Sequence, residues 1–420
     1  MPIASRRRRN VSVAIAVVIA AYVSGPLSND LILPVMPLLM AEFGASESSA
    51  QTVLSMLMLG TGLGCLIVGP LSDACGRVRI LVASFLAYAA SGFACLFAAD
   101  IQTLAALRFL QGVAGASAPV VGLAVINDML SRTQAASANS RAIAAMAFCG
   151  MLVPAVGTLL TAVFGWKSVW AATAVYGLVM AAACAWLLPE TLPKRSRQPL
   201  NPALLGTYLQ MLKSPLFMLY TAASSFSFAA LLCYIGPHSF IVLNTLALPQ
   251  HLFALLFAPL PAGVFVGARI AVVFLRRYSV EQTMLIGCAV QLAAGLAMLA
   301  MGLWTDPALT GLLAGMATLA VGMGLVMPSS QVACVKVFPS RGGAAGALAR
   351  MASMLVAALA MQLALIGFDG WLTAPATVIA LCAAAALAAT AAGMVVRQIE
   401  HRAARRLQED DQCDIIGCSP

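Results

Sequence analysis

The chain has 420 residues, of which 61% are hydrophobic and 9% are charged. Soluble domains carry about 25% charged residues, and a soluble fold with so few charges would expose large apolar patches. Despite a net charge of +9, the composition therefore excludes a water-soluble enzyme, a disordered chain and a nucleic-acid-binding domain. It indicates an integral membrane protein, in which 33 glycines and 21 prolines are compatible with helices in lipid.

The N-terminal segment begins with four arginines, Arg6–Arg9, followed by an apolar run that continues to about Met40. This run is too long for the apolar core of a cleavable signal peptide, and it contains Pro26, Asp30 and Pro34. We expect it to be retained as the first membrane helix.

Apolar windows of similar length recur along the rest of the chain. A hydrocarbon core about 30 Å thick requires roughly 20 apolar residues per helix. Twelve windows meet this requirement, which predicts an all-α membrane protein with twelve transmembrane helices in two six-helix halves. The windows lie near residues 12–38, 49–70, 80–99, 101–127, 138–164, 168–188, 215–240, 250–275, 281–303, 306–330, 344–368 and 371–397.

A polar connector over residues 189–213, rich in proline and basic residues, separates the sixth window from the seventh. It predicts an N-terminal six-helix bundle over 1–188, a cytoplasmic linker over 189–213 and a C-terminal six-helix bundle over 214–397. Two halves of nearly equal length are typical of transporters built from repeats. The charged tail over 398–420 is expected to be disordered, and we assign it no function.

Basic residues mark one side of the predicted membrane protein. Opposite them, the loops carry mainly acids, with Lys167 as the single basic residue. Because basic loops stay in the cytoplasm, we expect both termini to be cytoplasmic. The basic side comprises Arg6–Arg9, Arg77, Arg79, Arg132, Arg141, the linker, Arg276, Arg277, Lys336, Arg341, Arg350 and the arginines of the tail.

Two charges, Asp30 and Arg108, fall deep within apolar windows. Each costs about 2.5–3.5 kcal/mol at a helix centre on insertion scales. They lie at similar depths, about 12 Å and about 10 Å from the same surface at 1.5 Å per residue, so that an ion pair is feasible. One interpretation is a structural ion pair that orients the helices. We favour the other, in which Asp30 binds protons and substrate under the influence of Arg108, because the nearby prolines leave backbone groups free.

A loop with closely spaced glycines and charges connects the second window to the third. It has the sequence Gly69-Pro-Leu-Ser-Asp73-Ala-Cys-Gly76-Arg77. This pattern resembles the signature loop of the major facilitator superfamily. The resemblance implies a gating loop in which Asp73 and Arg77 latch the two halves together in the outward-facing state.

Three further segments resemble the drug:proton antiporters of the bicyclomycin/chloramphenicol-resistance (Bcr/CflA) group within that superfamily. The second is similar to the proton-coupling motif and the third to the antiporter motif. The resemblance implies that the first two segments couple the movement of protons to that of substrate. It also implies that the third segment bends its helix and packs it closely, which prevents proton leak. Ordinary helix packing is the alternative role for the glycines and the proline of the third segment. The segments are Asp30-Leu-Ile-Leu-Pro34-Val-Met-Pro37, Arg108-Phe-Leu-Gln111-Gly112 and Gly150-x-x-x-Pro154-x-x-Gly157.

Hydroxyl and aromatic side chains in the window 215–240 are candidates for the lining of a substrate cavity. They are Ser224, Ser227, Phe228 and Tyr234. Packing within the helix bundle is the alternative role for most of them. His238 and His251 are interpreted as interfacial, because they lie near the ends of their windows.

These patterns together predict a proton-coupled secondary active exporter that moves drugs or small amphipathic compounds out of the cytoplasm by alternating access. An exporter of an endogenous metabolite, such as a siderophore, is the alternative. The expected setting is a bacterial inner membrane, where a multi-pass monomer contacts the lipid bilayer, a small-molecule substrate and protons, and no nucleic acid.

Other functional classes lack their characteristic residues. The chain contains no Gly-x-x-x-x-Gly-Lys-Ser/Thr, His-Glu-x-x-His or Gly-x-Ser-x-Gly motif, so we expect no enzyme. The eleven cysteines lie mostly in apolar runs, and the spacing of Cys413 and Cys418 is unlike that of a zinc site. We therefore expect no cofactor and no metal. A channel or receptor fits the two equal halves less well than a transporter does.

Overall fold

The computed structural model describes residues 2–197, 203–303, 309–368 and 370–416, and these residues are almost entirely helical, with no strand among them. Twelve of the helical segments are long and apolar enough to cross a membrane, which confirms the predicted number. The twelve spans are Val11–Phe43, Glu47–Cys75, Arg77–Cys95, Ile101–Met129, Ser137–Phe164, Ser168–Leu187, Pro215–Thr245, Gln250–Phe274, Val280–Gly302, Leu309–Val337, Gly342–Leu363 and Thr373–Glu400.

The first six spans are formed by α1 to α9. Span one is broken, because Pro26, Pro34 and Pro37 have no backbone N–H to donate to the helix. The elements are α1 (Pro2–Tyr22), α2 (Ser24–Asn29), η1 (Leu33–Val35), α3 (Met36–Phe43), α4 (Glu47–Cys75), α5 (Arg77–Cys95), α6 (Ile101–Gly115), α7 (Ser117–Met129), α8 (Arg132–Phe164) and α9 (Ser168–Leu187).

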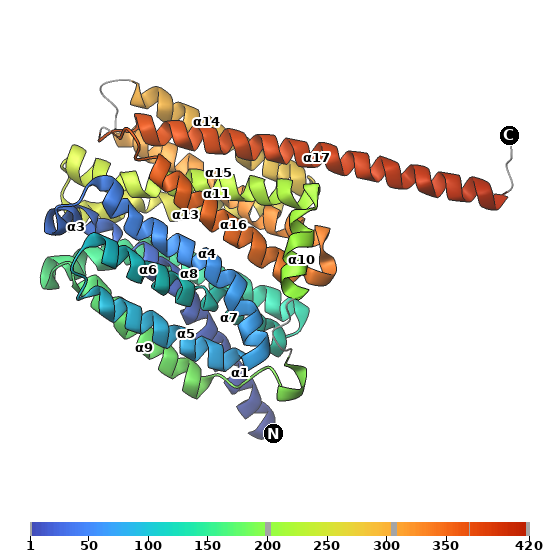
Figure 1. Cartoon of the computed structure of the whole chain (residues 1–420), viewed down its shortest axis with the longest axis horizontal. Helices are drawn as coiled ribbons and strands as arrows, with labels where there is room; N and C mark the ends of the chain where they lie inside the picture. The colour runs from blue at the N-terminus through green and yellow to red at the C-terminus, as the bar shows by residue number, and fades with distance from the viewer. Residues whose placement is uncertain (1, 198–202, 304–308, 369, 417–420) are drawn as a thin grey trace.

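The last six spans are formed by α11 to α17. They pack as a second group of helices beside the first (Figure 1). The linker and the second group contain η2 (Lys194–Ser196), α10 (Ala203–Leu212), α11 (Pro215–Phe240), the π-helical turn η3 (Ile241–Thr245), η4 (Gln250–Leu252), α12 (Phe253–Phe257), α13 (Pro259–Phe274), α14 (Val280–Gly302), α15 (Leu309–Val337), η5 (Pro339–Arg341), α16 (Gly342–Leu363) and α17 (Thr373–Ile416).

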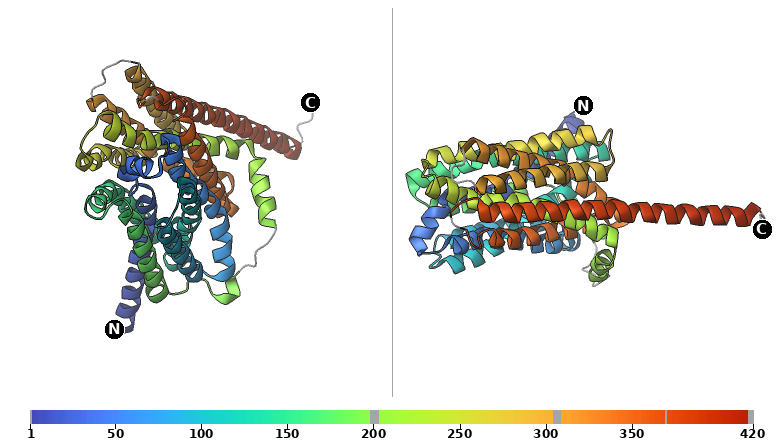
Figure 2. Two further views of the ribbon diagram at one scale, coloured as in Figure 1. Left: turned by 60° about the vertical axis from the view of Figure 1, so that its left-hand side comes forward. Right: turned by 90° about the horizontal axis from the view of Figure 1, so that it is seen from above.

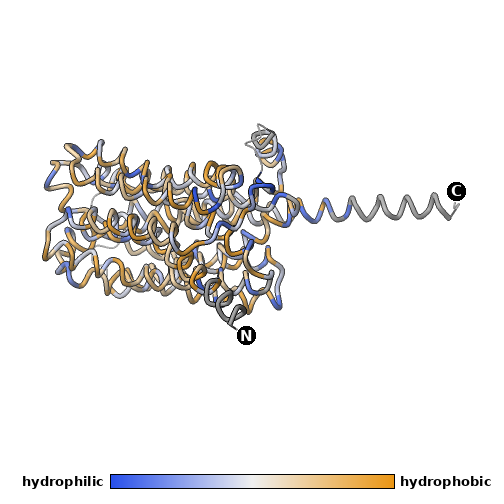
Figure 3. Tube along the Cα trace, turned by 90° about the horizontal axis from the view of Figure 1, so that it is seen from below, coloured by the Kyte–Doolittle hydropathy of each residue, from blue (hydrophilic) through white to orange (hydrophobic). Residues whose placement is uncertain are grey.

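The linker and both ends of the chain lie at one end of the bundle, which we call the linker end; the other is the far end (Figures 1 and 2). Hydrophobic residues predominate along the bundle, and hydrophilic ones gather toward its two ends (Figure 3). The arrangement is the one expected of helices that cross a lipid bilayer.

The prediction of a disordered tail was wrong over residues 398–416. Helix α17 continues without interruption to Ile416 and projects from the linker end as a single long helix (Figures 1 and 2). Between Gly393 and Gly417 the chain contains neither glycine nor proline, and it includes four arginines and three glutamines, which are strong helix formers. This local propensity outweighed the high charge on which the prediction was based.

The two groups of helices share their most extensive hydrophobic core at the far end, and nearer the linker end Leu66 of α4 still packs against the core of the second group. At the far end, Leu54 of α4 belongs to the same buried cluster as Ile235 of α11 and Phe257 of α12. At the linker end each group has its own core, one around Phe85 and the other around Phe217. The halves are therefore joined mainly at the far end and separate toward the linker end.

Glycines allow close helix crossings at corresponding places in the two halves. A Cβ atom on Gly112 of α6 would lie 2.8 Å from the Thr61 backbone nitrogen of α4, so that only glycine fits. A Cβ atom on Gly324 of α15 would likewise lie 2.7 Å from the Ala268 backbone nitrogen of α13. Because these pairs are the second and fourth spans of each half, the same small-residue crossing recurs in both.

We expect Gly112→Ala to destabilise the first half, because the added methyl group would meet backbone atoms that cannot move aside. Overpacking of this kind costs about 1–3 kcal/mol. The thermal unfolding midpoint of the detergent-purified protein should fall. Gly346→Ala is the matched control, because a Cβ atom at that position on α16 meets no atom within 4 Å. An equal loss of stability in the two variants would contradict this account.

Candidate functional site

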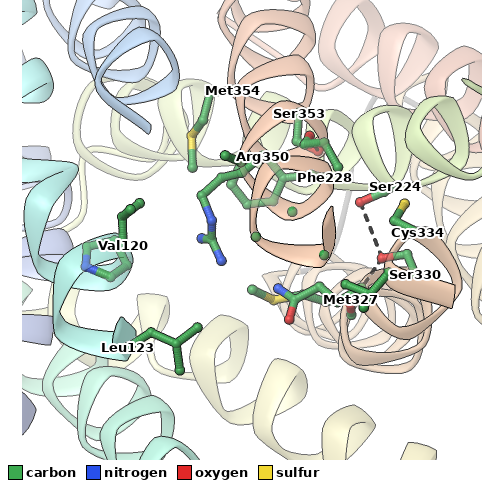
Figure 4. A pocket seen from close by; sticks show the side chains of 18 of the residues that line it. Val120, Leu123, Ser224, Phe228, Met327, Ser330, Cys334, Arg350, Ser353 and Met354 are labelled. Carbon is green, nitrogen blue, oxygen red and sulfur yellow. Dashed lines mark hydrogen bonds between the residues drawn. The ribbon is translucent and has the colours of Figure 1, made fainter. Parts of the chain in front are cut away.

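A cavity of about 290 Å³ lies between the two groups of helices, toward the linker end. On one side it is lined by Val120 and Leu123 of α7 (Figure 4). On the other it is lined by residues of α11, α15 and α16, including Phe228, Met327 and Met354. Its wall is thus mainly apolar and comes from both halves of the chain, as expected of a site for a small molecule.

Two of the four predicted lining residues face this cavity. Ser224 and Phe228 line it, whereas Ser227 and Tyr234 do not. The Ser227 hydroxyl donates a 2.6 Å hydrogen bond to Gln291 Oε1 within the second half. Tyr234 is buried, with its hydroxyl 3.0 Å from His238 Nδ1. Ser227 lies about 60° around the helix from Ser224 and faces α14, while Tyr234 lies about 15 Å farther along α11 than Ser224.

Arg350 also lines the cavity. Its position there was not predicted from the sequence, because Arg350 was counted among the basic residues on one side of the membrane. This arginine lies about two turns inside α16, is partly exposed, and lines the cavity. The signal that could have found it is a charge inside an apolar window, the same signal that singled out Asp30 and Arg108.

Arg108 lies fully buried within the first half. Its Nη1 donates a 2.6 Å hydrogen bond to Gln111 Oε1, so the two residues that the proton-coupling motif implied lie together on α6. Its Nη2 donates to the backbone carbonyl of Ser28. The guanidinium carbon also lies 5.3 Å from the centroid of the Trp170 ring of α9, within cation–π range.

Asp30 follows directly after α2 and is partly exposed. Its Oδ1 accepts a 2.9 Å hydrogen bond from Asn29 Nδ2, and its Oδ2 would lie 3.5 Å from a Cβ atom on Gly150 of α8. The ion pair with Arg108 that similar depths allowed is not formed; the described ion pairs involve other residues. Arg108 therefore reaches span one at the backbone carbonyl of Ser28, two residues before Asp30, whereas the Asp30 side chain faces α8.

The three positions of the antiporter motif are buried on α8. A Cβ atom on Gly157 would meet the Leu31 carbonyl and would lie 3.2 Å from Pro34 Cγ. Gly150 and Gly157 therefore allow α8 to contact the broken part of span one, and Pro154 lies between them. A Cβ atom on Gly150 would also lie 3.9 Å from Pro261 of α13, which places this contact where the two halves meet.

The freed backbone of span one receives a second side chain at the far end. Gln250 Nε2 of η4 donates a 3.1 Å hydrogen bond to the Pro34 carbonyl. Nearby, Gln362 Nε2 of α16 donates to Thr52 Oγ1 at 2.9 Å and to Ser55 Oγ at 3.3 Å. These bonds cross from one half to the other and hold the far end closed.

The prediction of a loop over residues 69–77 was wrong except at Gly76, because residues 69–75 form the end of α4 and Arg77 begins α5. This segment, which we continue to call the gating loop, lies at the linker end and is held by ion pairs. Arg77 Nη1 lies 2.5 Å from Asp73 Oδ1, and its Nε lies 3.4 Å from Asp128 Oδ2. The Arg77 backbone N–H donates a 2.9 Å bond to Glu190 Oε1. Gly76 has a φ of 109°, which other residues rarely adopt.

All these partners of the gating loop lie in the first half or in the first residues of the linker. Gly69, which opens the loop, accepts a 2.8 Å bond from the hydroxyl of Ser72 through its backbone carbonyl. Among the described residues, none from α11 to α17 bonds to Asp73 or Arg77. The loop is thus ordered without contact to the second half.

Residues 18–361 of the chain match the Major Facilitator Superfamily. The chain belongs to this superfamily. Curated relatives include a chloramphenicol resistance protein, CraA, of Acinetobacter baumannii, which is 26% identical over 71% of this chain and 72% of its own length. A bicyclomycin resistance protein homolog of Haemophilus influenzae is 24% identical over 66% and 72%. The multidrug transporter MdfA of Yersinia pestis is 24% identical over 83% and 84%.

Membership of the superfamily makes this chain a multi-pass membrane transporter of small molecules rather than an enzyme. The three relatives named above are drug-resistance or multidrug-transport proteins, in agreement with the resemblance to the Bcr/CflA group. Both groups of helices contribute residues to the cavity that lies between them.

The interpretation of His238 as interfacial was wrong. Its side chain is completely buried in the second half, and its ring lies 5.4 Å from that of Phe253 and 5.8 Å from that of Phe257, measured between centroids. The physical reason is that η3, η4 and α12 cover the end of α11, so that they shield His238 from the surface of the protein. His251 is exposed, and its interfacial position stays a prediction.

We expect Arg108→Met to destabilise the transporter, because the Ser28 carbonyl and the Gln111 side chain would lose a buried partner. Each unsatisfied buried group costs about 1–3 kcal/mol. The thermal unfolding midpoint should fall well below that of Arg141→Met, in which the lost arginine is exposed on α8. Equal midpoints for the two variants would contradict a structural contribution of these bonds.

Proposed function

We propose that this transporter is a proton-coupled exporter, which carries drugs or small amphipathic compounds out of the cytoplasm by alternating access. The observation that carries the proposal is the apolar cavity between the halves, together with relatives named for resistance to chloramphenicol and bicyclomycin. We further propose a bacterial inner membrane as its location, a monomer as its active form, and the two helix groups as units that move relative to each other.

The distribution of charge supports the orientation. Basic side chains of the linker, of the gating loop and of the loop before α14 gather at the linker end, among them Lys194, Arg77 and Arg277. By the positive-inside rule this end faces the cytoplasm, with both termini. The cavity then lies toward the cytoplasmic side and the closed end faces outward, which is the inward-facing state in which an exporter loads its substrate.

Asp30 is the proposed proton-binding group. It lies beside the α8 motif at the contact between the halves, so that opening of the far end would change its access to water. Arg108 and Gln111 act in this scheme through the backbone, because Arg108 bonds to Ser28, two residues before Asp30. Any shift of span one relative to α6 would move Asp30, which couples its protonation to the conformation without an ion pair.

The gating loop has a complementary role in the proposal. In the inward-facing state the linker ends of the halves are apart, and Asp73 and Arg77 bond within the first half only. In the outward-facing state, when the linker end closes, the resemblance to the family implies that these residues latch the halves together. The loop is already ordered by Asp128 and Glu190, so that little ordering would remain on closure.

The proton gradient suffices for the proposed transport. One charge that crosses a potential of 100 mV releases about 2.3 kcal/mol. Since 1.4 kcal/mol corresponds to a factor of ten, one proton per neutral molecule supports about 50-fold accumulation.

We expect Asp30→Asn to abolish proton-driven transport, because the amide cannot release a proton. Chloramphenicol accumulation in everted membrane vesicles energised by respiration measures this directly. Glu42→Gln, which removes an exposed acid of α3, should transport like the wild type. Wild-type accumulation by Asp30→Asn would remove Asp30 from its proposed role. If the wild type moves no drug and a deletion strain instead retains an endogenous metabolite, the metabolite exporter is the correct alternative.

We expect Gly346→Phe to block the cavity. A side chain at this position on α16 would project into open space that the substrate is proposed to occupy. Binding of chloramphenicol to the purified protein should be lost, with the unfolding midpoint retained. Gly206→Phe is the matched control, because its position on α10 is equally open and does not line the cavity. Undiminished binding by Gly346→Phe would place the substrate elsewhere.

A further inference from the structure

The charge in the cavity limits what can bind there. Arg350 is the single charged side chain among the described residues that line the cavity. It takes part in none of the described ion pairs and forms no hydrogen bond with a described residue. By contrast, Arg77, Arg108 and Arg397 each have partners within the protein.

The side chains that surround this unpaired cation are apolar or uncharged. Its guanidinium projects into the space between Val120 and Leu123 of α7 and Met327 of α15 (Figure 4). Ser224 and Ser330 also line the cavity and are neutral. Arg350 belongs to the second half and lies within electrostatic reach of Tyr22 of α1 and Cys65 of α4 in the first half.

Alternating access makes this cation costly unless something binds it. When the linker end closes over the cavity, the guanidinium loses water, and a charge removed from water without a partner is strongly unfavourable. Removal of one partner from a buried ion pair costs about 3–5 kcal/mol for the same reason. No described acidic residue lines the cavity to pair with Arg350. A substrate that carries the opposite charge would supply the missing partner.

We propose that the cavity binds amphipathic organic anions more tightly than neutral molecules such as chloramphenicol, with Arg350 as the residue that determines this preference. The planar guanidinium matches a carboxylate in a bidentate geometry, while Phe228, Met327 and Met354 contact the apolar body. The volume of about 290 Å³ is at the lower end of the range of small-molecule pockets, and it suits a compact aromatic body better than a diacyl lipid. This inference rests on the proposed function, because it names the substrate class of the same cavity.

The test compares three ligands that share one ring system and differ in charge: anthracene carboxylate, the neutral anthracene carboxamide and the cationic aminomethyl anthracene. Their binding to the full-length detergent-purified protein is measured by fluorescence titration at neutral pH. The wild type should bind the carboxylate about tenfold more tightly than the carboxamide, as expected for one charge-assisted hydrogen-bonded contact. The cationic ligand should bind most weakly.

Two variants of Arg350 and one control variant test whether Arg350 causes the preference for the carboxylate over the carboxamide. Arg350→Gln should bind carboxylate and carboxamide about equally, and Arg350→Lys should keep a reduced preference because lysine has charge without the bidentate fork. Arg269→Gln removes an exposed arginine of α13 outside the cavity and should leave the preference unchanged. Size-exclusion chromatography verifies that each variant is folded.

A wild type that binds the neutral or cationic ligand as tightly as the carboxylate overturns the inference, even if Arg350→Gln does not fold. A full preference that persists in Arg350→Gln also overturns it. Transport in proteoliposomes tests the proposed function separately. If a proton gradient drives none of the three ligands, then proton-coupled export fails while the binding preference still stands. Preferred transport of the carboxamide or of the cation would support export and contradict the role of Arg350.

Discussion

The broken first span imposes the constraint on which the rest of this structure depends. In lipid, no water can bond to backbone groups that leave the helix, so protein must satisfy them. The interruption around residues 30–35 frees the carbonyls of Ser28 and Pro34, which accept bonds from Arg108 and Gln250. The glycines of α8 bring that helix against the same segment. The Arg108 segment and the glycines of α8 thus share one physical role, which is to cover an irregular stretch of backbone in span one.

The two bonds to this segment differ in where they originate. Arg108 belongs to the first half, so that its bond to Ser28 persists as long as that half moves as a unit. Gln250 belongs to the second half, and its bond to Pro34 exists only while the far end is closed. The same holds for the bonds of Gln362 to Thr52 and Ser55. The closed far end is therefore stabilised by hydrogen bonds that break when the halves move apart, together with the shared hydrophobic core at that end.

The charged residues within the bundle also fall into two groups. The surroundings of one group stay the same when the halves move, and the surroundings of the other group change. Arg108 is paired and stacked on Trp170 inside one half, where no rearrangement of the halves exposes it. Asp30 and Arg350 lie where the halves meet, partly exposed and without an opposite charge beside them. Groups in such positions experience a different solvent environment in each conformation. This is the property that both proton binding and substrate selection require of a transporter that alternates its access.

The sequence alone determined the membrane location and the twelve spans, and it placed Arg108 and Gln111 one turn apart on the same helix. Span length depends on bilayer thickness and hydropathy, and contacts between residues three apart depend on local helix geometry. The helical tail was missed because its helix propensity was judged less important than its charge. Which side chains face one another across helices was decided only by the tertiary structure. The rotation of each helix about its axis directs Asp30 toward α8, Ser227 toward Gln291 and Arg350 into the cavity. That rotation depends on the packing of the whole bundle, which no single window of sequence contains.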